Sequence, residues 1–300
     1  MTGSSLQLSV IIPTKNRGRI LSELLESIRL LDDVGTIRPE VIAADNNSSD
    51  STYDLATSVA TDFPTTLRVL KVVKPGKSAA INAAAKLASG NVLAFLDDDV
   101  VVDHAWLTGV NDFYRQGKFA AGQGLIRLQA PERDDPEIIK LVQRYRTIPN
   151  LEHDPNVKPL HSLNGANFFV SRNAFELAGG FDERLGPGAS GTSEDVDFAR
   201  RLTRAGIAIG YVPRAIVYHR VERHRLTEEY FKQIHWRQGG SRFLIQRRGA
   251  AAILCDLTRV GIQYVFYTLI GKERNRYRSK GRIYHYLGMI AAKRNRSSKC

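Results

Sequence analysis

The stretch that decides the fold is Asn91–Asp99, which reads NVLAFLDDD. Its first six residues are nearly all apolar, and such a run favours a strand buried on both faces, as in a parallel sheet. Three carboxylates follow this strand directly. Because ligands in open parallel sheets bind beyond the carboxyl ends of the strands, these carboxylates mark the first place to look for a site.

Strand and helix patterns alternate before this stretch. Apolar or β-branched runs predict strands, and apolar residues at helical spacing predict the helices between them. The expected strands are 8–12, 41–44 and 67–73, with a later one at 163–170, and the expected helices are 20–31, 48–63 and 78–88. Alternation of this kind implies right-handed crossovers. We therefore predict an α/β fold with a Rossmann-like, mostly parallel central sheet flanked by helices.

Charge divides the chain into an acidic front and a basic back. The net charge of +12 comprises +9 in residues 200–248 and +9 in residues 272–300, which leaves −6 for residues 1–199. A basic surface of this size indicates an anionic partner, such as a membrane surface, a nucleic acid or a phosphorylated substrate. A solvated tail is the alternative.

Several features bear on location. No secretory signal is evident at the N-terminus, and the two cysteines form no evident framework, so we expect a cytoplasmic protein. The apolar stretch 250–271 contains Asp256 and Arg259, which disfavours a helix that spans a membrane and favours an interfacial one. The basic residues that follow would favour anionic lipid. Peripheral association with the inner face of the cell membrane is our hypothesis.

The acidic triplet Asp97–Asp99 favours a metal site. Three adjacent carboxylates repel one another, and the neighbouring apolar strand raises that cost. A hard divalent cation relieves the repulsion, and Mg²⁺ or Mn²⁺ would bind one or two of the carboxylates together with diphosphate oxygens. The alternative is a solvated loop whose acids cap the next helix. The position after a buried strand favours the metal and nucleotide site.

Four motifs resemble those of family 2 glycosyltransferases with the GT-A fold. They are Val10–Arg17 (VIIPTKNR), Asp45–Thr52 (DNNSSDST), Phe95–Asp99 (FLDDD) and Glu194–Asp195, in the family's order and within about residues 7–220. One such motif is weak, but four in register are specific. The resemblance implies an inverting enzyme that takes a sugar from a nucleoside-diphosphate sugar, most often a UDP-sugar, with Mn²⁺ or Mg²⁺ as cofactor.

The resemblance also implies a nucleotide site and a metal site at the strand ends. Asp45 matches the acid that contacts the base or ribose, whereas Asn46 replaces the usual second acid. Lys77 lies in a segment that fits the family's pattern only loosely. The implied nucleotide-binding residues are Pro13, Thr14, Arg17, Asp45, Lys77, Asp97 and Asp98. The implied metal ligands are Asp97, Asp99 and His219.

Asp195 matches the family's general base, which accepts the proton of the acceptor hydroxyl as it attacks the anomeric carbon. Glu194 would orient Asp195 or the acceptor. Acids are also typical of the start of a helix, and the two roles are compatible.

The sugar and acceptor residues are less specific. Asn164–Asn167 resembles the family segment that lines the sugar site, with Asn164, Gly165 and Ala166 as the implied sugar residues, and a strand start with a bulge is the alternative. Trp236 is a candidate for stacking on a sugar, with a core position left open. For Trp106 we expect a core position.

We predict a catalytic domain over residues 1–225, with a nucleotide-binding half at 1–105 and an acceptor half at 106–225, and a helical basic extension over 226–300. The expected acceptor is a polysaccharide, a lipid-linked oligosaccharide or a glycolipid precursor. A sugar nucleotidyltransferase would need a Gly-rich signature where PTKNR stands. A protein that binds nucleic acid or another anionic surface is the other alternative, but no nucleic-acid-binding module is evident, so nucleic acid is not the expected partner. The oligomeric state is left open.

Overall fold

The computed structural model describes residues 6–154, 159–246 and 248–297. They form two compact units. The first comprises the residues up to Gln129 with Pro149–Arg184 and Glu194–Arg220. The second comprises Ala130–Ile148, Leu185–Ser193 and the residues from Val221 onward. Each unit therefore joins segments that are far apart in the sequence.

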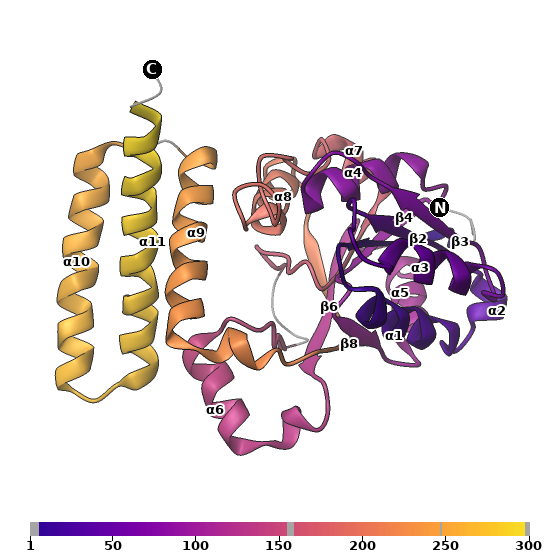
Figure 1. The fold of residues 1–300 in the computed structure, drawn as a ribbon, viewed down its shortest axis with the longest axis horizontal. Helices are drawn as coiled ribbons and strands as arrows, with labels where there is room; N and C mark the ends of the chain where they lie inside the picture. The colour runs from indigo at the N-terminus through magenta and orange to yellow at the C-terminus, as the bar shows by residue number, and fades with distance from the viewer. Residues whose placement is uncertain (1–5, 155–158, 247, 298–300) are drawn as a thin grey trace. The chain divides into compact units, whose positions relative to one another are not determined.

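Among the described residues, eight strands form one sheet in the first unit (Figure 1). The strands are β1 Leu8–Thr14, β2 Glu40–Asp45, β3 Leu67–Lys71, β4 Val92–Leu96, β5 Val100–Val102, β6 Ala121–Leu128, β7 Asn167–Ser171 and β8 Ile209–His219. Their order across the sheet is β3-β2-β1-β4-β7-β6-β8-β5. β7 is antiparallel to β4 and β6, and β5 is antiparallel to β8, while the other pairs are parallel. The prediction of a mostly parallel sheet is confirmed.

Helices cover both faces of this sheet. One face packs against α1 (Gly18–Arg29), α3 (Thr52–Ala60) and α5 (Trp106–Arg115), and a short helix, α2 (Val34–Ile37), follows α1. The other face packs against α4 (Lys77–Leu87), α7 (Arg172–Leu177) and α8 (Glu194–Arg204). Strand β1 feeds both layers, because Val10 and Ile12 face one side and Ile11 faces the other. Burial on both faces explains why the central strands are apolar throughout.

Two details differ from or extend the sequence predictions. Helix α3 begins at Thr52 rather than at residue 48, because the backbone N–H and hydroxyl of Ser48 both donate to Asp45. Trp106 is fully buried, and its Nε1–H donates to Asn167 Oδ1 at 2.9 Å. The expectation of a core position for Trp106 is confirmed.

The second unit is helical. Its helices are α6 Pro136–Tyr145, α9 Glu228–Ile245, α10 Ala250–Leu269 and α11 Glu273–Ser297, with short 3₁₀ turns at Glu132–Asp134 and Arg223–Leu226. Helix α11 lies between α9 and α10 (Figure 1). Against α9 it approaches through glycines, since a Cβ on Gly239 would lie 1.9 Å from the His285 carbonyl oxygen. A small apolar core that includes Phe243, Ile253 and Met289 joins the three helices.

No described helix is both long enough and apolar enough to span a membrane. Cys255 is an exposed free cysteine, and Cys300 lies outside the described residues.

Candidate active site

Polar side chains gather at the carboxyl ends of the parallel strands. Thr14 at the end of β1 is in register with Asp45 at the end of β2. The acidic triplet follows β4, which pairs with β1 on the other side. Because these strands run in the same direction, their ends meet at one edge of the sheet, where the sequence predicted the nucleotide site.

Asp98 is held by the loop after β1. Its carboxylate accepts hydrogen bonds from Thr14 Oγ1 at 2.8 Å and Arg17 Nη1 at 3.1 Å. Arg17 Nη1 also donates to Asp99 Oδ2 at 3.1 Å, so one guanidinium joins two acids of the triplet. Burial raises the pKa of Asp98 to about 6 against the lowering effect of Arg17, and Asp99 adds to the rise.

His219 brings the end of β8 to Asp99. Its Nδ1 lies 2.8 Å from the Arg220 carbonyl oxygen, which can only accept, so Nδ1 carries a proton. Nε2 faces Asp99 Oδ1 at 3.4 Å, which places two acceptors opposite each other when the ring is neutral. A proton on Nε2 or a cation bound by both atoms satisfies this pair. A histidine whose other nitrogen donates to a carbonyl is typical of metal ligands, so these two residues fit a divalent cation.

Asp97 faces a different partner. Its Oδ1 lies 2.5 Å from Lys77 Nζ, and the same ammonium lies 3.4 Å from Glu194 Oε1. Burial lowers the pKa of Lys77, but Asp97 and Glu194 raise it, and the net shift is upward. Asp97 is thus paired with Lys77, and the described residues contain no group of three His, Cys, Asp or Glu side chains placed to hold a metal. The role of Asp97 as a metal ligand stays a prediction.

Asp195 lies in the first turn of α8, beside Glu194. Its Oδ2 accepts the Gly165 N–H at 3.0 Å and its Oδ1 accepts the Val196 N–H at 2.7 Å. Burial raises the pKa of Asp195 to about 7; Glu194 adds to the rise and Lys77 opposes it. The result is a carboxyl group that changes charge near neutral pH, as a general base requires.

A small pocket joins these groups within the first unit. A Cβ on Gly165 would lie 3.2 Å from Lys77 Nζ, so glycine keeps the backbone close to the ammonium. The pocket is lined by Pro13, Lys77, Ile81, Phe95, Leu96, Asp97, Gly165, Phe168, Phe181, Glu194 and Asp195. Residues that were predicted to bind the nucleotide, to bind the sugar and to act in catalysis therefore line the same pocket.

The sugar segment is positioned by two buried amides, Asn167 within the segment and Gln123, which sequence reasoning missed. Gln123 accepts the Asn164 N–H at 2.7 Å and donates to the Asn167 carbonyl at 2.8 Å. Asn167 donates to the carbonyls of Leu125 and Ala215 at 3.0 Å and 2.8 Å. No sequence pattern marks them, because each amide bonds to backbone atoms of distant segments. Ala166, next to Asn167, is fully buried.

Asn46 also has a positioning role. Its side chain donates to the carbonyls of Val72 and Lys74 and accepts the Gly76 N–H at 2.8 Å. This amide therefore fixes the loop that leads to Lys77, and as a carboxamide it cannot take the role of the acid that it replaces. Asp45 beside it is 1% exposed and accepts from Ser48.

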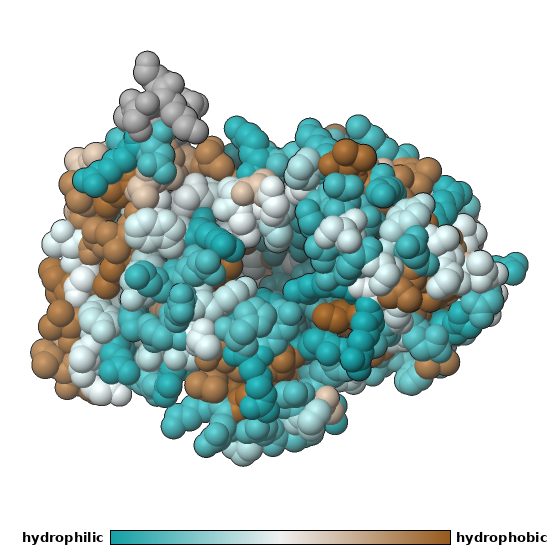
Figure 2. All heavy atoms as spheres, viewed as in Figure 1, coloured by the Kyte–Doolittle hydropathy of each residue, from teal (hydrophilic) through white to brown (hydrophobic). Residues whose placement is uncertain are grey.

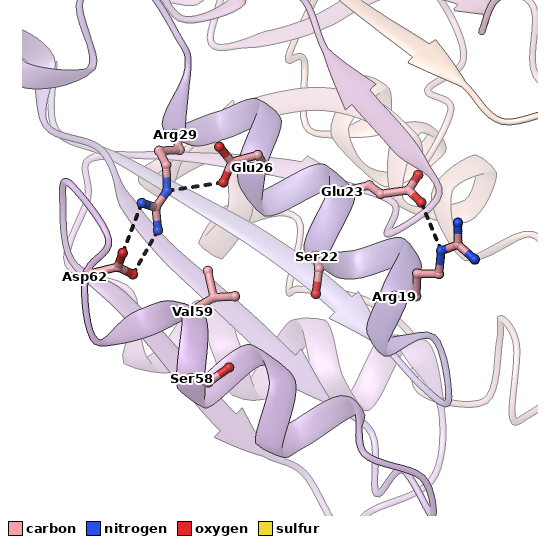
Figure 3. Close-up of a pocket in the computed structure, with 8 residues that line it drawn as sticks. All are labelled: Arg19, Ser22, Glu23, Glu26, Arg29, Ser58, Val59 and Asp62. Atoms are coloured by element: carbon pink, nitrogen blue, oxygen red, sulfur yellow. Dashed lines mark hydrogen bonds and ion pairs between the residues drawn. The ribbon is translucent and has the colours of Figure 1, made fainter.

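Two other features are not among the residues that line this pocket. Trp236 lies on α9 of the second unit and is 41% exposed, so the core alternative for it is wrong. Figure 3 shows a second hollow, lined by side chains of α1 and α3 and by Asp62. Its charges pair with one another, because Arg29 binds Glu26 and Asp62 while Arg19 binds Glu23. It holds none of the predicted site residues.

The fold and the comparisons define a glycosyltransferase with the GT-A fold. The structure resembles the mannosyltransferase PcManGT from Pyrobaculum calidifontis, solved in complex with GDP-Man and Mn²⁺, with a TM-score of 0.64. The two chains are 16% identical, and the match covers 96% of this chain and 87% of the other, so this likeness shows the fold.

The chain belongs to glycosyl transferase family 2, which matches residues 9–176. It is 26% identical over 220 residues to Glycosyltransferase AglE from Haloferax volcanii, covering 73% of this chain and 68% of that protein. It is also 26% identical over 239 residues to succinoglycan biosynthesis protein ExoM from Rhizobium meliloti, covering 80% and 75%. The resemblance stated from the four motifs is confirmed.

Proposed function

We propose that the protein transfers a sugar, with inversion, from a nucleoside-diphosphate sugar to a hydroxyl group of a polysaccharide, lipid-linked or glycolipid precursor. The observation that carries this proposal is the convergence of Asp97, Glu194 and Asp195 around Lys77 in one pocket at the carboxyl edge of the sheet. Lys77 is the cation here that would face an anionic diphosphate, and Asp195 is the base that would lie beside the sugar.

In the proposed reaction Asp195 acts as the base. The acceptor hydroxyl passes its proton to Asp195 while its oxygen forms a bond to the anomeric carbon, and the bond from that carbon to the diphosphate breaks. A pKa of about 7 supports this role, because the carboxylate is available at neutral pH and is still basic enough to accept a proton. Glu194 and the Gly165 N–H orient it.

The same proposal assigns roles to the donor residues. Pro13, Thr14, Arg17, Asp45, Lys77, Asp97 and Asp98 contact the nucleotide, and Asn164, Gly165 and Ala166 contact the sugar. Arg17 and Lys77 supply the cationic groups, and both are now held by acids of the triplet. A diphosphate would compete with those acids for the two cations. Trp236 remains a predicted acceptor contact.

A divalent cation belongs to the proposal. Asp99 and His219 would hold it, with Asp97 as the further predicted ligand, and the imidazole favours Mn²⁺ over Mg²⁺. When bound, the cation offsets the negative charge that develops on the leaving diphosphate.

Thermal stabilisation by nucleoside diphosphates, with and without Mn²⁺, tests the donor site. We favour UDP over GDP as the donor base, and the panel includes both. We expect a metal-dependent shift with one base that is lost in Asp99→Asn and kept in Asp54→Asn, an exposed acid on α3. Absence of a shift with every nucleotide would overturn the proposal.

We also propose that α10 lies on an anionic membrane surface. Five large apolar side chains share one face of this helix and are more than half exposed: Leu254, Ile262, Val265, Phe266 and Leu269. Figure 2 shows the hydrophobic surface over α10, at the left of the view. Exposed Lys272, Arg274 and Arg278 follow directly, and this charge favours anionic lipid as the occupant of the apolar face.

Flotation with vesicles tests this surface. We expect binding to vesicles that contain phosphatidylglycerol, and loss of that binding in Leu269→Glu but not in Leu177→Glu, which changes another exposed leucine, on α7. Binding that is unchanged in Leu269→Glu would contradict the proposal. A dimer that Leu269→Glu dissociates would instead assign the face to a second copy of the chain.

A further inference from the structure

The end of α6 and the start of α11 bring basic side chains together within the second unit. Arg144 Nη2 lies 2.7 Å from Glu273 Oε1, and the Tyr145 ring packs edge-on against Tyr277 with centroids 5.6 Å apart. These contacts fix the last turn of α6 on the first turns of α11. Arg146, the next residue, ends α6 in a left-handed conformation with φ of 55°.

Two arginines of α11 lie near Arg146. Arg274 and Arg278 are four residues apart, so they share one helix face, and both are exposed. Burial lowers the pKa of Arg146, and the charges of Arg278 and Arg274 lower it further. Arg146 follows Tyr145 directly, and Arg274 and Arg278 follow Glu273 and Tyr277, the residues that Arg144 and Tyr145 contact, so these contacts bring the three arginines to one junction. We call them the arginine triad.

No carboxylate of the described residues forms an ion pair with the triad. The nearby acids on these helices have other partners. Glu273 binds Arg144, Glu228 binds Lys280, and Asp256 binds Arg248 and Arg259. Clustered like charges repel one another, and an anion from outside would offset that repulsion.

The positive potential extends along the seam between α9 and α11. Burial lowers the pKa of His285 to about 4, and His235, Arg242 and Arg282 lower it further. The pKa of His235 on α9 is also lowered by burial, and Arg146 contributes. Both imidazoles are therefore neutral near pH 7. The adjoining Arg282 donates to Gln263 at 3.3 Å, which is again a neutral partner.

We propose that Arg146, Arg274 and Arg278 bind a phosphate or diphosphate group. Guanidinium groups match phosphate oxygens with pairs of hydrogen bonds, and a dianion between three of them replaces repulsion with attraction. The group belongs to an anionic lipid or to a soluble phosphate compound. This site goes beyond the proposed transfer reaction and does not depend on it.

Calorimetric titration of the full chain with inorganic pyrophosphate, in low salt and with a chelator, tests the site. We expect each of Arg146→Gln, Arg274→Gln and Arg278→Gln to weaken binding by about tenfold. Arg276→Gln is the matched control, because it removes the same charge from the opposite face of α11. We expect Arg276→Gln to leave the affinity for pyrophosphate within about twofold. Its ion pair with Glu273, at 4.0 Å, is long, so its removal should also disturb the fold little. Thermal unfolding checks that every variant is folded.

Vesicles distinguish the two sources of phosphate. For a lipid ligand, Arg278→Gln loses binding to phosphatidylglycerol vesicles while Arg276→Gln keeps it. For a soluble ligand, Arg278→Gln and Arg276→Gln differ in the pyrophosphate titration but not in their binding to vesicles. Equal behaviour of the triad variants and Arg276→Gln in both assays, or no binding of either probe by the unaltered protein, would overturn the proposal.

Discussion

At the scale of single residues, Asp195 gives the candidate site its pH dependence. Its pKa of about 7 is set by burial and Glu194 against the opposing effect of Lys77. The same lysine is bonded to Asp97, so the proposed base and the proposed donor site share one cation. Binding of a diphosphate to Lys77 would therefore also change the basicity of Asp195.

We predict that kcat/KM rises with pH and levels off above about 7. Below that value Asp195 is protonated and cannot accept a proton, so the rate falls about tenfold for each unit of pH. In Lys77→Gln the inflection moves to higher pH, because the charge that lowers the pKa of Asp195 is gone. A pH–rate series on both proteins measures this. Lys86→Gln, an exposed lysine of the same helix, is the control, and an inflection that stays in place in Lys77→Gln would contradict the account.

The sequence predicted the acids of the triplet because they follow an apolar strand, and Asp97 and Asp99 could be found in this way. Asp195 was indicated by the family resemblance, because an acid at the start of a helix is common. The partners of these acids could not be predicted. The bond from Lys77 to Asp97 and the bonds from Gln123 to the sugar segment join residues 20 and more than 40 positions apart, and local patterns carry no signal for such contacts.

At the scale of elements, the seam between α9 and α11 depends on glycine. The Cβ of any other residue at position 239 would lie 1.9 Å from the His285 carbonyl oxygen, which is backbone and cannot turn aside. Gly240, the next residue of α9, has no atom within 4 Å of the place where its Cβ would be. Gly239 is therefore the position that tests the packing, and the adjacent Gly240 is its control.

We predict that Gly239→Ala lowers the free energy of unfolding by about 1–3 kcal/mol, because the helices must separate to admit the methyl group. Gly240→Ala should raise it by about 0.5–1 kcal/mol, since alanine loses less backbone entropy in a helix. Urea unfolding followed by circular dichroism measures both. The packing described for the seam is wrong if Gly239→Ala is as stable as Gly240→Ala.

Elements with a strong local pattern were predictable, and elements defined by distant pairing were not. The strands β1, β2 and β4 are apolar runs closed by polar residues. Strands β6 and β8 pair with each other in parallel although about 80 residues separate them, and β8 contains a proline, an arginine and two tyrosines that interrupt the apolar pattern. Only the folded sheet explains them.

At the scale of the whole molecule, the two units draw on segments scattered along the chain. Residues 130–148 and 185–193 belong to the helical unit although they precede most of it in the sequence. Sequence periodicity cannot assign such segments, because their contacts are with helices formed later in the chain. The functional division at residue 225, into a catalytic part and a basic extension, stays a prediction.

The buried imidazoles predict how stability depends on pH. The pKa of His285 falls from 6.5 to about 4 on folding, chiefly through burial, so the unfolded chain binds a proton more readily. Stability should therefore fall as the pH drops from about 6.5 to about 4, with no further loss from this group below that range. Urea unfolding across this range measures the slope. It should be shallower in His285→Asn than in the unaltered protein, whereas His161→Asn, at an exposed position, should match the unaltered protein.

The most direct test of the central claim compares donor binding and turnover in Asp195→Asn. Release of nucleoside diphosphate is measured with the donor that gives the largest thermal shift, alongside that shift in the same variant. The account predicts that Asp195→Asn keeps the metal-dependent shift and loses about 10²–10⁴-fold in kcat, because the base is gone while the nucleotide site is intact. Turnover at the unaltered rate in Asp195→Asn would contradict it.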